Sequence, residues 1–480
     1  MIRLWDGIRP TTEENLHDNE GECMMKRKSS RILALILALA TMLSLAACGK
    51  KADDQGAPVE TNPDDATYNE LGEVELVGKF ELQIFVGGYG AEAWEYAIAE
   101  FQKLHPDLEI TAHMDPNVNA QMKNRWAKDN PPDFVFLEGT NIPTETWMRE
   151  NKLRDLTSLY ETGTVYGTET PIKEQLKEGL TFTFGDTGKI FQMPILLSTY
   201  GVWYDETLMN EKGWSVPTNY TQLQSFCKDA SSAGISPMIY TGQYSGYAVW
   251  GFLMPAVASA AVESNDLDFF YDVCTAANSD VWSDARFKDA LQKFADLANA
   301  GYFNPAGLSM NHINSQVSWL NHEAVLIPNG LWLETEMKDS TPEGFKMRYY
   351  PSVTHDADQK PCIIASASSF GIAEKAKNPK AAEEFIRFLY TDEISKVFAE
   401  KCAVPVATKT DMSTANLTET AKQVNDMINS DDVVLVAKAG TSWGSVDGTI
   451  NDVVNKIVSK KYTVDQAIDA LKKATDKKNK

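Results

Sequence analysis

Residues 79–138 alternate between segments that favour strands and segments that favour helices, and this alternation restricts the possible folds more than any other feature. Alternating apolar residues predict a strand at Lys79–Val86. Apolar residues three and four positions apart predict a helix after it. Strands at Leu108–Ala112 and Phe134–Leu137 follow, with a polar helix between them. Strands that alternate with helices form a parallel sheet covered by helices, so the predicted fold class is α/β.

Length and charge narrow the class of protein. The chain has 480 residues, of which 43% are hydrophobic, and this is enough for a sizeable core and for more than one lobe. Its formal net charge is −22. A chain this acidic repels the phosphates of a nucleic acid, so we expect no nucleic-acid partner. The charge indicates nothing positive about a ligand, because many soluble surfaces are acidic.

The amino end has the organisation of an export signal. A basic segment that begins at Met24 precedes the fourteen residues Ile32–Leu45, of which only two are polar. This run is shorter than a bilayer-spanning helix and is typical of the apolar core of a signal peptide. Residues 1–23 are acidic and do not fit before such a signal, so we expect translation to begin at Met24 or Met25.

The apolar run ends in the sequence LAACG, residues 45–49. Small residues before a cysteine resemble the lipobox of bacterial lipoproteins. The resemblance implies that Cys48 carries a lipid such as palmitate, forms the mature amino terminus and anchors the chain to the cell membrane. The alternative is a plain secretory signal with an incidental cysteine. Residues 49–75 are rich in Asp, Pro, Gly and Lys and predict a flexible tether.

Four cysteines follow at wide spacings and without a CxxC pair, so the sequence does not predict a metal knuckle. An exported protein can hold disulfides. The sequence leaves two possibilities open, two bridges or four buried thiols, for these residues: Cys227, Cys274, Cys362 and Cys402.

The segment Ala324–Met337 places a large aromatic ring at the edge of the predicted sheet. Val325–Ile327 is a short apolar run that predicts a buried strand, and Pro328–Gly330 is predicted to end that strand in a turn. Trp332 then begins a helix. Open α/β sheets bind ligands at the carboxyl ends of their strands, so Trp332 is a candidate binding residue. The alternative is that its ring packs on the core.

Four more aromatic residues are candidates for a binding site. Tyr89 lies in a Gly-rich loop, GGYG, which lacks both the Rossmann spacing and a Walker lysine and therefore does not predict a nucleotide site. Tyr244 lies in an aromatic loop after a predicted strand. Trp443 lies in a polar loop, so we expect it to be exposed to a cleft. Trp126 lies on a helix, where a place in the core is an equal alternative.

Three polar residues are candidates because each lies at a strand end or in the turn after it: Asp115, Glu138 and Asn329. Carboxylate and amide groups in such positions can hydrogen-bond a ligand in fixed directions. Each of the three can instead cap a neighbouring helix.

Several motifs, in order, resemble the extracellular solute-binding proteins of bacterial ABC importers, family 1, which bind carbohydrates. The matching segments cover nearly all of residues 76–478: FQKLHPDLEIT, PPDFVFLEG, GVWYDETLMNEKGWSVPTNYTQL, HEAVLIPNGLW, NPKAAEEFIRFLYTDE and YTVDQAIDALKKA. The segment WLETEMKDSTPEGF looks most like binders of N-acetylglucosamine or chitobiose.

The resemblance implies a periplasmic-binding-protein-like fold, in which two α/β lobes are joined by three hinge crossings. Three segments predicted to be extended fit these crossings: Met193–Thr199, Cys362–Ser366 and Ala403–Val406. The implied amino-terminal lobe comprises residues 76–193 and 366–405, and the implied carboxyl-terminal lobe comprises residues 194–365 and 406–480.

The resemblance also implies a function. It implies a lipid-anchored monomer on the outer face of the cell membrane that binds a sugar between its lobes and delivers it to an ABC permease. It implies no catalysis, cofactor or metal. Trp332 and Trp443 match positions that the family uses to stack sugar rings. Because only the closed form makes both sets of contacts, the ligand shifts the hinge towards closure.

Two other classes of function remain open at this stage. Asp115 and Glu138 form a pair of carboxylates that would also suit a lipid-anchored glycoside hydrolase or polysaccharide lyase. The sequence contains no HExxH zinc motif. A lipoprotein that binds a peptide or a metal is the third alternative.

Overall fold

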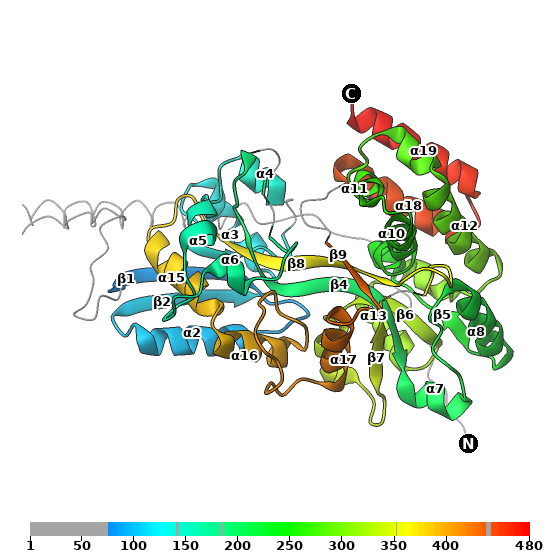
Figure 1. Ribbon diagram of the computed structural model, residues 1–480, viewed down its shortest axis with the longest axis horizontal. Helices are drawn as coiled ribbons and strands as arrows, with labels where there is room; N and C mark the ends of the chain where they lie inside the picture. Colours follow the sequence, from blue (N-terminus) through cyan, green and yellow to red (C-terminus); the bar gives the residue numbers. More distant parts are fainter. Residues whose placement is uncertain (1–74, 141–143, 182, 185–186, 352, 438–442) are drawn as a thin grey trace, which may run out of the picture. The chain divides into compact units, whose positions relative to one another are not determined.

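The computed structural model describes residues 75–140, 144–181, 183–184, 187–351, 353–437 and 443–480 (Figure 1). The predicted signal segment, Cys48 and almost all of the tether lie outside these ranges. The described residues all belong to one compact unit. None of the helices within these ranges is both long enough and apolar enough to cross a membrane.

The strand–helix alternation predicted near the amino end is confirmed. Strands β1 (Gly78–Phe85), β2 (Leu108–Asp115) and β3 (Phe134–Phe136) are parallel, with β1 in the middle. Helix α2 (Glu92–Leu104) connects β1 to β2, and α3 (Val118–Ala127) connects β2 to β3. All three strands therefore end at the same edge of the sheet, where the loops after β1 and β3 meet.

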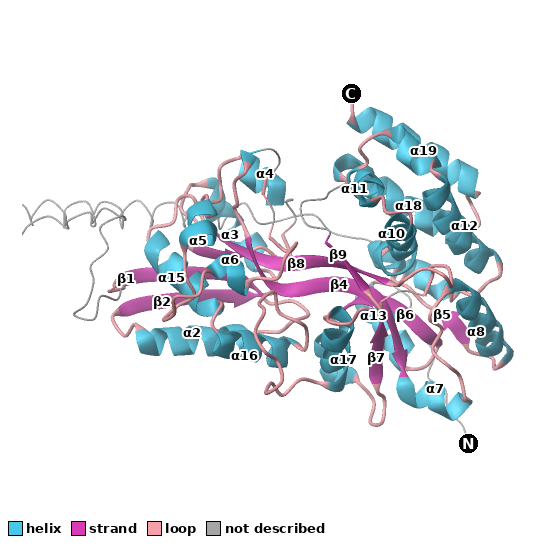
Figure 2. Cartoon of the chain, in the orientation of Figure 1, coloured by secondary structure: helices cyan, strands magenta, loops and turns pink. Residues whose placement is uncertain are grey.

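Two long strands connect this first group of strands to a second group. Figure 2 shows β4 (Met193–Asp205) and β8 (Cys362–Ile372) side by side through the middle of the sheet. They pair antiparallel from Met193 opposite Phe370 to Thr199 opposite Ala365. The order of strands along the sheet is β2-β1-β3-β8-β4-β6-β5.

The third predicted extended segment pairs with β4. The Leu197 N–H donates to the carbonyl of Pro405 at 2.8 Å, and the Ala407 N–H donates to the carbonyl of Ile195 at 2.9 Å. Ala403 departs from the prediction, because it has a left-handed backbone (φ 54°) at the end of the preceding helix. The part of this segment that pairs with β4 begins at Pro405, two residues later than the sequence indicated.

The second group of strands lies around the other ends of β4 and β8. Strand β6 (Ala324–Gly330) is antiparallel to β4 and parallel to β5 (Ser236–Met238). Strand β7 (Met347–Tyr350) is antiparallel to β4, and β9 (Val434–Ala437) is parallel to β8.

The turn predicted at Pro328–Gly330 is wrong. Strand β6 continues through these residues, with Pro328 opposite Val202 and Gly330 opposite Tyr200. The φ angle of proline, near −65°, is compatible with an extended chain, so a proline that rules out a helix does not by itself end a strand. The neighbouring strand β4 supplies the partner that extends β6.

Helices cover both groups of strands. The remaining α-helices are α4 (Thr144–Arg149), α5 (Thr157–Thr162), α6 (Ile172–Gln175), α7 (Glu206–Lys212), α8 (Tyr220–Ser232), α9 (Gly246–Ala248), α10 (Met254–Glu263), α11 (Leu267–Thr275), α12 (Ala285–Asn299), α13 (His312–Leu320), α14 (Leu333–Glu336), α15 (Pro379–Leu389), α16 (Asp392–Cys402), α17 (Glu419–Ile428), α18 (Asp447–Val458) and α19 (Val464–Lys478). Short 3-10 or π segments are η2 (Gly242–Tyr244), η3 (Val249–Leu253), η4 (Ser279–Ser283), η5 (Pro305–Ser309), η6 (Lys338–Ser340) and η7 (Gly444–Val446).

The predicted helix starts agree with the structure. Pro379 is the first residue of α15, and the side chain of Asn378 caps that helix. Thr391 caps α16. Thr463 and Gln466 form the expected reciprocal capping box at the start of α19. These local signals predict helix ends well because each cap satisfies backbone N–H groups within a few residues of it.

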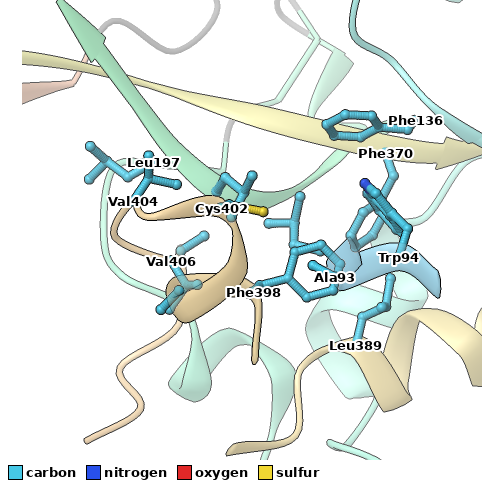
Figure 3. Close-up of a cluster of buried hydrophobic side chains, with 14 of the residues drawn as sticks. Ala93, Trp94, Phe136, Leu197, Phe370, Leu389, Phe398, Cys402, Val404 and Val406 are labelled. Atoms are coloured by element: carbon cyan, nitrogen blue, oxygen red, sulfur yellow. The ribbon is translucent and has the colours of Figure 1, made fainter. Parts of the chain in front are cut away.

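One core is built from aromatic rings under the first group of strands. Trp94 of α2 meets Phe136 at a centroid distance of 5.0 Å and Phe398 at 4.9 Å. Figure 3 shows these rings with Phe370 of β8 and the thiol of Cys402. A second core lies among α8, α10, α11, α12, α18 and α19. The four cysteines in the described chain (Cys227, Cys274, Cys362 and Cys402) are buried thiols, so the second of the two possibilities left open by the sequence holds.

Candidate functional site

A cavity of about 450 Å³ brings together four of the predicted site residues. Tyr89 and Glu138 come from the loops after β1 and β3. Tyr244 and Trp332 come from the second half of the chain. The cavity thus lies where the carboxyl ends of the first strands face the aromatic loops of the second group. Its other lining residues are Phe85, Gly87, Gly88, Gly90, Trp94, Phe136, Gly139, Tyr247, His312 and Glu336.

Two glycines allow Trp332 to occupy its position. Trp332 lies two residues after Gly330, the end of β6, and directly before the short helix α14. A Cβ on Gly330 would lie 2.2 Å from Cζ3 of the indole, so the ring covers the end of its own strand. A Cβ on Gly88 would lie 2.9 Å from the Cβ of Trp332. The GGYG loop therefore needs a glycine here in order to approach the tryptophan this closely.

Three tyrosines surround the indole. The ring of Tyr200 lies edge-on to Trp332 at a centroid distance of 5.3 Å, and Tyr89 lies edge-on to it at 6.2 Å. Tyr247 is tilted against it at 5.6 Å. These are favourable geometries for aromatic pairs, and they hold Trp332 in one orientation.

The line of rings continues from this cluster to the protein surface. Tyr247 stacks on Tyr244 at 6.5 Å, with an angle of 25° between the rings, and Tyr244 has an exposed fraction of 54%. His312 at the start of α13 meets Tyr244 edge-on at 5.7 Å. The site therefore offers aromatic faces from the inside of the cavity to its mouth.

One carboxyl group enters the cavity from the first group of strands. Its residue, Glu138, is anchored through its backbone carbonyl, which accepts from Asn119 Nδ2 at 2.9 Å. Burial raises the pKa of the Glu138 carboxyl, and the hydroxyl of Ser368 acts in the opposite direction. Burial also raises the pKa of Tyr89, and the charge of Glu138 adds to that effect. The Tyr89 hydroxyl donates to Ser198 Oγ at 3.4 Å.

A second carboxyl group enters from α14. Glu336 Oε2 accepts from Gln316 Nε2 at 2.8 Å, and Glu336 Oε1 lies 3.4 Å from His312 Nε2. The Gln316 side chain is buried. Glu336 is therefore held in place by two side chains from α13.

Trp443 requires a correction. We expected it to be exposed to a cleft, but its exposed fraction is 4% and its side chain lies in the second core. The indole N–H donates to the carbonyl of Val273 at 2.7 Å, and the ring stacks on Trp250 at 4.7 Å. A polar sequence around a tryptophan indicates a loop, but neighbours distant in sequence decide where the ring points.

Trp126 is also a core residue. Its indole N–H donates to Gln83 Oε1 at 2.7 Å, and its ring packs on Trp147 at 4.3 Å. The core alternative that the sequence left open therefore describes this residue, which does not line the cavity.

The last two polar candidates lie outside the described cavity lining. Asp115 Oδ1 accepts from the N–H of Asn117 at 2.6 Å and so stabilises the turn before α3. Asn329 is fully buried within β6, where its Oδ1 accepts from the N–H of Gly330 at 2.8 Å. Both side chains therefore accept hydrogen bonds from backbone N–H groups of their own segments.

Tyr247, His312 and Glu336 are among the cavity-lining residues that sequence reasoning missed. Glu336 follows Trp332 by four positions, a spacing that places two side chains on one helical face, and this signal was available. Tyr247 follows the predicted Tyr244 by three positions. The position of His312 depends on how α13 packs, so no local pattern indicates it.

A larger hollow, of about 1,050 Å³, lies between the segment 409–417 and α17. None of the described residues that line it is aromatic. It therefore lacks the flat apolar faces that distinguish the first cavity, which we take as the candidate site.

Comparisons with known proteins agree with the fold described above. The family model described as bacterial extracellular solute-binding protein matches residues 87–396. A diacetylchitobiose-binding protein, NgcE of Streptomyces coelicolor, is 25% identical over 341 residues, which are 68% of this chain and 69% of that protein. A multiple sugar-binding protein of Streptococcus mutans is 20% identical over 312 residues, 65% of this chain and 71% of that protein.

Solved structures show the same fold at low sequence identity. A chitin oligosaccharide binding protein superposes with a TM-score of 0.65 at 18% identity and covers 84% of this chain and 99% of its own. RafE, a solute-binding protein solved in complex with raffinose, superposes with a TM-score of 0.64 at 15% identity and covers 83% of this chain and 100% of its own.

Proposed function

The chain belongs to the bacterial extracellular solute-binding proteins, and on this premise we propose that it captures a carbohydrate in the cavity around Trp332 and delivers it to the membrane subunits of an ABC importer. Sugars need two kinds of contact. Their C–H faces pack on aromatic rings, and their hydroxyl groups need polar partners in fixed directions. The cavity offers the rings of Trp332, Tyr247 and Tyr244 together with the carboxyl groups of Glu138 and Glu336.

One observation carries the proposal: a tryptophan held by three tyrosines forms the wall of a cavity that also contains two carboxyl groups. The names of the relatives support the same ligand class, since they bind diacetylchitobiose and other sugars. An oligosaccharide of N-acetylglucosamine is accordingly the first ligand to test.

The family consists of binding proteins, so this chain is a carrier and not an enzyme. The carboxylate pair that would have suited a glycosidase does not line one cavity, because Asp115 Oδ1 serves the turn before α3 while Glu138 faces the site. A sugar should therefore leave the protein unchanged.

We also propose that the ligand closes two lobes, residues 76–193 with 366–405 and residues 194–365 with 406–480, around a hinge. Strands β4 and β8 and the segment after Ala403 support this proposal, because they are the paired segments that connect the two groups of strands. A ligand that contacts both lobes favours the closed state by its difference in affinity for the two states.

The family is extracellular, and one solved neighbour is a probable secreted solute-binding lipoprotein of Streptomyces coelicolor. We propose that Cys48 carries the lipid that holds this chain, as a monomer, at the outer face of the cell membrane near its permease. Palmitate labelling in cells should be lost in Cys48→Ser and retained in Cys227→Ser. Equal labelling of the two variants would contradict the anchor.

A thermal-shift screen over mono- and oligosaccharides tests the function, because a ligand that binds only the folded state stabilises it by mass action. Calorimetry then compares Trp332→Ala with the parent. A sugar ring covers about 60 Å² of apolar indole surface, which is worth about 1.5 kcal/mol, so the affinity should fall about tenfold.

Trp214→Ala is the matched control for this variant. Trp214 is also half-buried, packs on Phe226 at 5.7 Å and lies outside the cavity, so its removal should leave the affinity unchanged. Stabilisation by peptides or metal ions and by no sugar would overturn the proposed function. Release of smaller sugars during incubation would indicate an enzyme.

A further inference from the structure

The charges that line the cavity all have one sign, apart from a histidine. Glu138, which follows β3, and Glu336 of α14 both line it, and none of its described lining residues is Lys or Arg. His312 is the only basic side chain in this lining, and it is already held against Glu336 at 3.4 Å. A negatively charged ligand in this cavity therefore finds no cationic lining residue other than His312, which already lies against Glu336.

The surroundings of Glu138 do not compensate its charge. Burial raises the pKa of this carboxyl, and none of the described lining residues is a Lys or Arg that would lower it. A carboxylate of this kind, removed from water, interacts with a second charge more strongly than it would at the surface. A cationic group would be attracted and an anionic group repelled.

The aromatic lining also favours cationic groups over anionic ones. The faces of Trp332, Tyr247 and Tyr244 carry the negative part of each ring's quadrupole, which attracts cations and polarised C–H groups. A carboxylate placed over such a face loses its hydration without gaining an attractive partner.

The same effect opposes the ionisation of two tyrosine hydroxyls in the site. The charge of Glu138 adds to the effect of burial in raising the pKa of Tyr89. The charge of Glu336 does the same for Tyr247. Both glutamates thus disfavour a further anion within the ring cluster.

Resting on the function proposed above, we propose that the cavity selects glycans by charge. It admits neutral and amine-bearing sugars and rejects sugars that carry a carboxylate, and Glu138 and Glu336 are the residues that determine this specificity.

The test compares sugars that share one disaccharide backbone and carry different charges. N,N′-diacetylchitobiose is the neutral probe, chitobiose carries free amines, and the C6-oxidised form of diacetylchitobiose carries a carboxylate. Calorimetry should show that the carboxylate weakens binding to the parent protein at least about 30-fold relative to the neutral sugar. The amine form should bind within about tenfold of the neutral sugar or more tightly than it.

Two controls separate charge from shape and from general damage. The methyl ester of the oxidised sugar is larger but uncharged, so it should bind nearly as well as the neutral sugar. In the protein, the double variant Glu138→Gln with Glu336→Gln should reduce the 30-fold discrimination to below about fivefold. Glu334→Gln removes the same charge from α14, but Glu334 faces Thr418 and not the cavity, so this variant should keep the full discrimination.

The outcomes distinguish the two proposals. If the carboxylate sugar binds the parent as tightly as the neutral sugar, or if the double variant discriminates as strongly as the parent, selection by charge is refuted while the sugar-binding function stands. If the methyl ester is rejected as strongly as the acid, shape and not charge governs the choice. If no sugar in the series or the screen binds, the proposed function fails and selection by charge fails with it.

Discussion

The position of Trp443 in a core leads to a prediction that separates a structural tryptophan from a binding one. Replacing Trp443 by Phe removes the indole N–H that donates to the carbonyl of Val273 at 2.7 Å. It also shortens the ring that stacks on Trp250. We expect this change to lower the free energy of unfolding and to leave the affinity for sugar unchanged.

The magnitude follows from the contacts. The Val273 carbonyl also accepts from the N–H of Ala276 at 3.2 Å, so it keeps one donor, and the lost hydrogen bond costs about 1 kcal/mol. A void of about 30 Å³ left by the smaller ring adds about 0.7 kcal/mol. The sum is about 2 kcal/mol. Trp443→Ala removes the stacked ring as well and should cost about 4 kcal/mol.

Urea unfolding followed by circular dichroism measures this loss. With an m value of about 3 kcal/mol/M, the midpoint of Trp443→Phe should fall by about 0.7 M. Calorimetric titration with sugar, under conditions where the variant is folded, should give an affinity within about twofold of the parent. Trp332→Ala provides the opposite pattern, a large loss of affinity with a smaller change in midpoint.

A particular combination of results would refute the reasoning. If Trp443→Phe kept the urea midpoint of the parent and lost tenfold or more in affinity, the ring would contact the ligand. The assignment of Trp443 to the core would then be wrong for the protein in solution.

Three further predictions concern the loop, a buried carboxylate and a buried histidine. Gly88→Ala adds a methyl group 2.9 Å from the Cβ of Trp332, so calorimetry should show weaker sugar binding at a nearly unchanged urea midpoint, and equal affinity would contradict the close approach. Asp133→Asn weakens the hydrogen bonds that the Asp133 carboxylate accepts from three backbone N–H groups, one of them that of Glu81 at 2.8 Å. The free energy of unfolding, measured in urea, should fall by about 3 kcal/mol. A loss under about 0.5 kcal/mol would contradict this prediction. Burial lowers the pKa of His355 to about 4, so the unfolded chain, with an ordinary pKa near 6.5, binds the additional proton. The contribution of the buried neutral His355 to stability is complete above about pH 6.5 and is lost as the pH falls towards 4. The urea midpoint of His355→Gln should therefore fall less steeply with decreasing pH than that of the parent, and an equally steep fall would rule this out.

Local sequence signals predicted much of the fold. The strands near the amino end and the caps of α15, α16 and α19 depend on side chains within a few residues of each element, and these agree with the structure. The end of β6 was not predicted, because strand β4, which is more than a hundred residues earlier in the chain, extends it through Pro328.

Part of the candidate site was also predicted from local sequence signals. Tyr89, Glu138, Tyr244 and Trp332 each lie just after a strand, and strand ends meet at one edge of the sheet. Trp443 was misjudged because its neighbours, among them Val273 of α11, are distant in sequence. A polar sequence context describes the backbone around a residue and not the direction of its side chain.

The buried thiols offer separate reporters of local opening. Cys402 lies in the core beneath the first strands, whereas Cys227, Cys274 and Cys362 belong to the second core. Burial raises the pKa of Cys402 to about 12 and that of Cys362 to about 11, so both remain protonated and unreactive while covered. Alkylation kinetics resolved by mass spectrometry would therefore time the exposure of each of the two cores separately. The carbonyl of Cys402 accepts from Thr335 of α14 at 2.9 Å, so occupancy of the neighbouring cavity should slow its modification first.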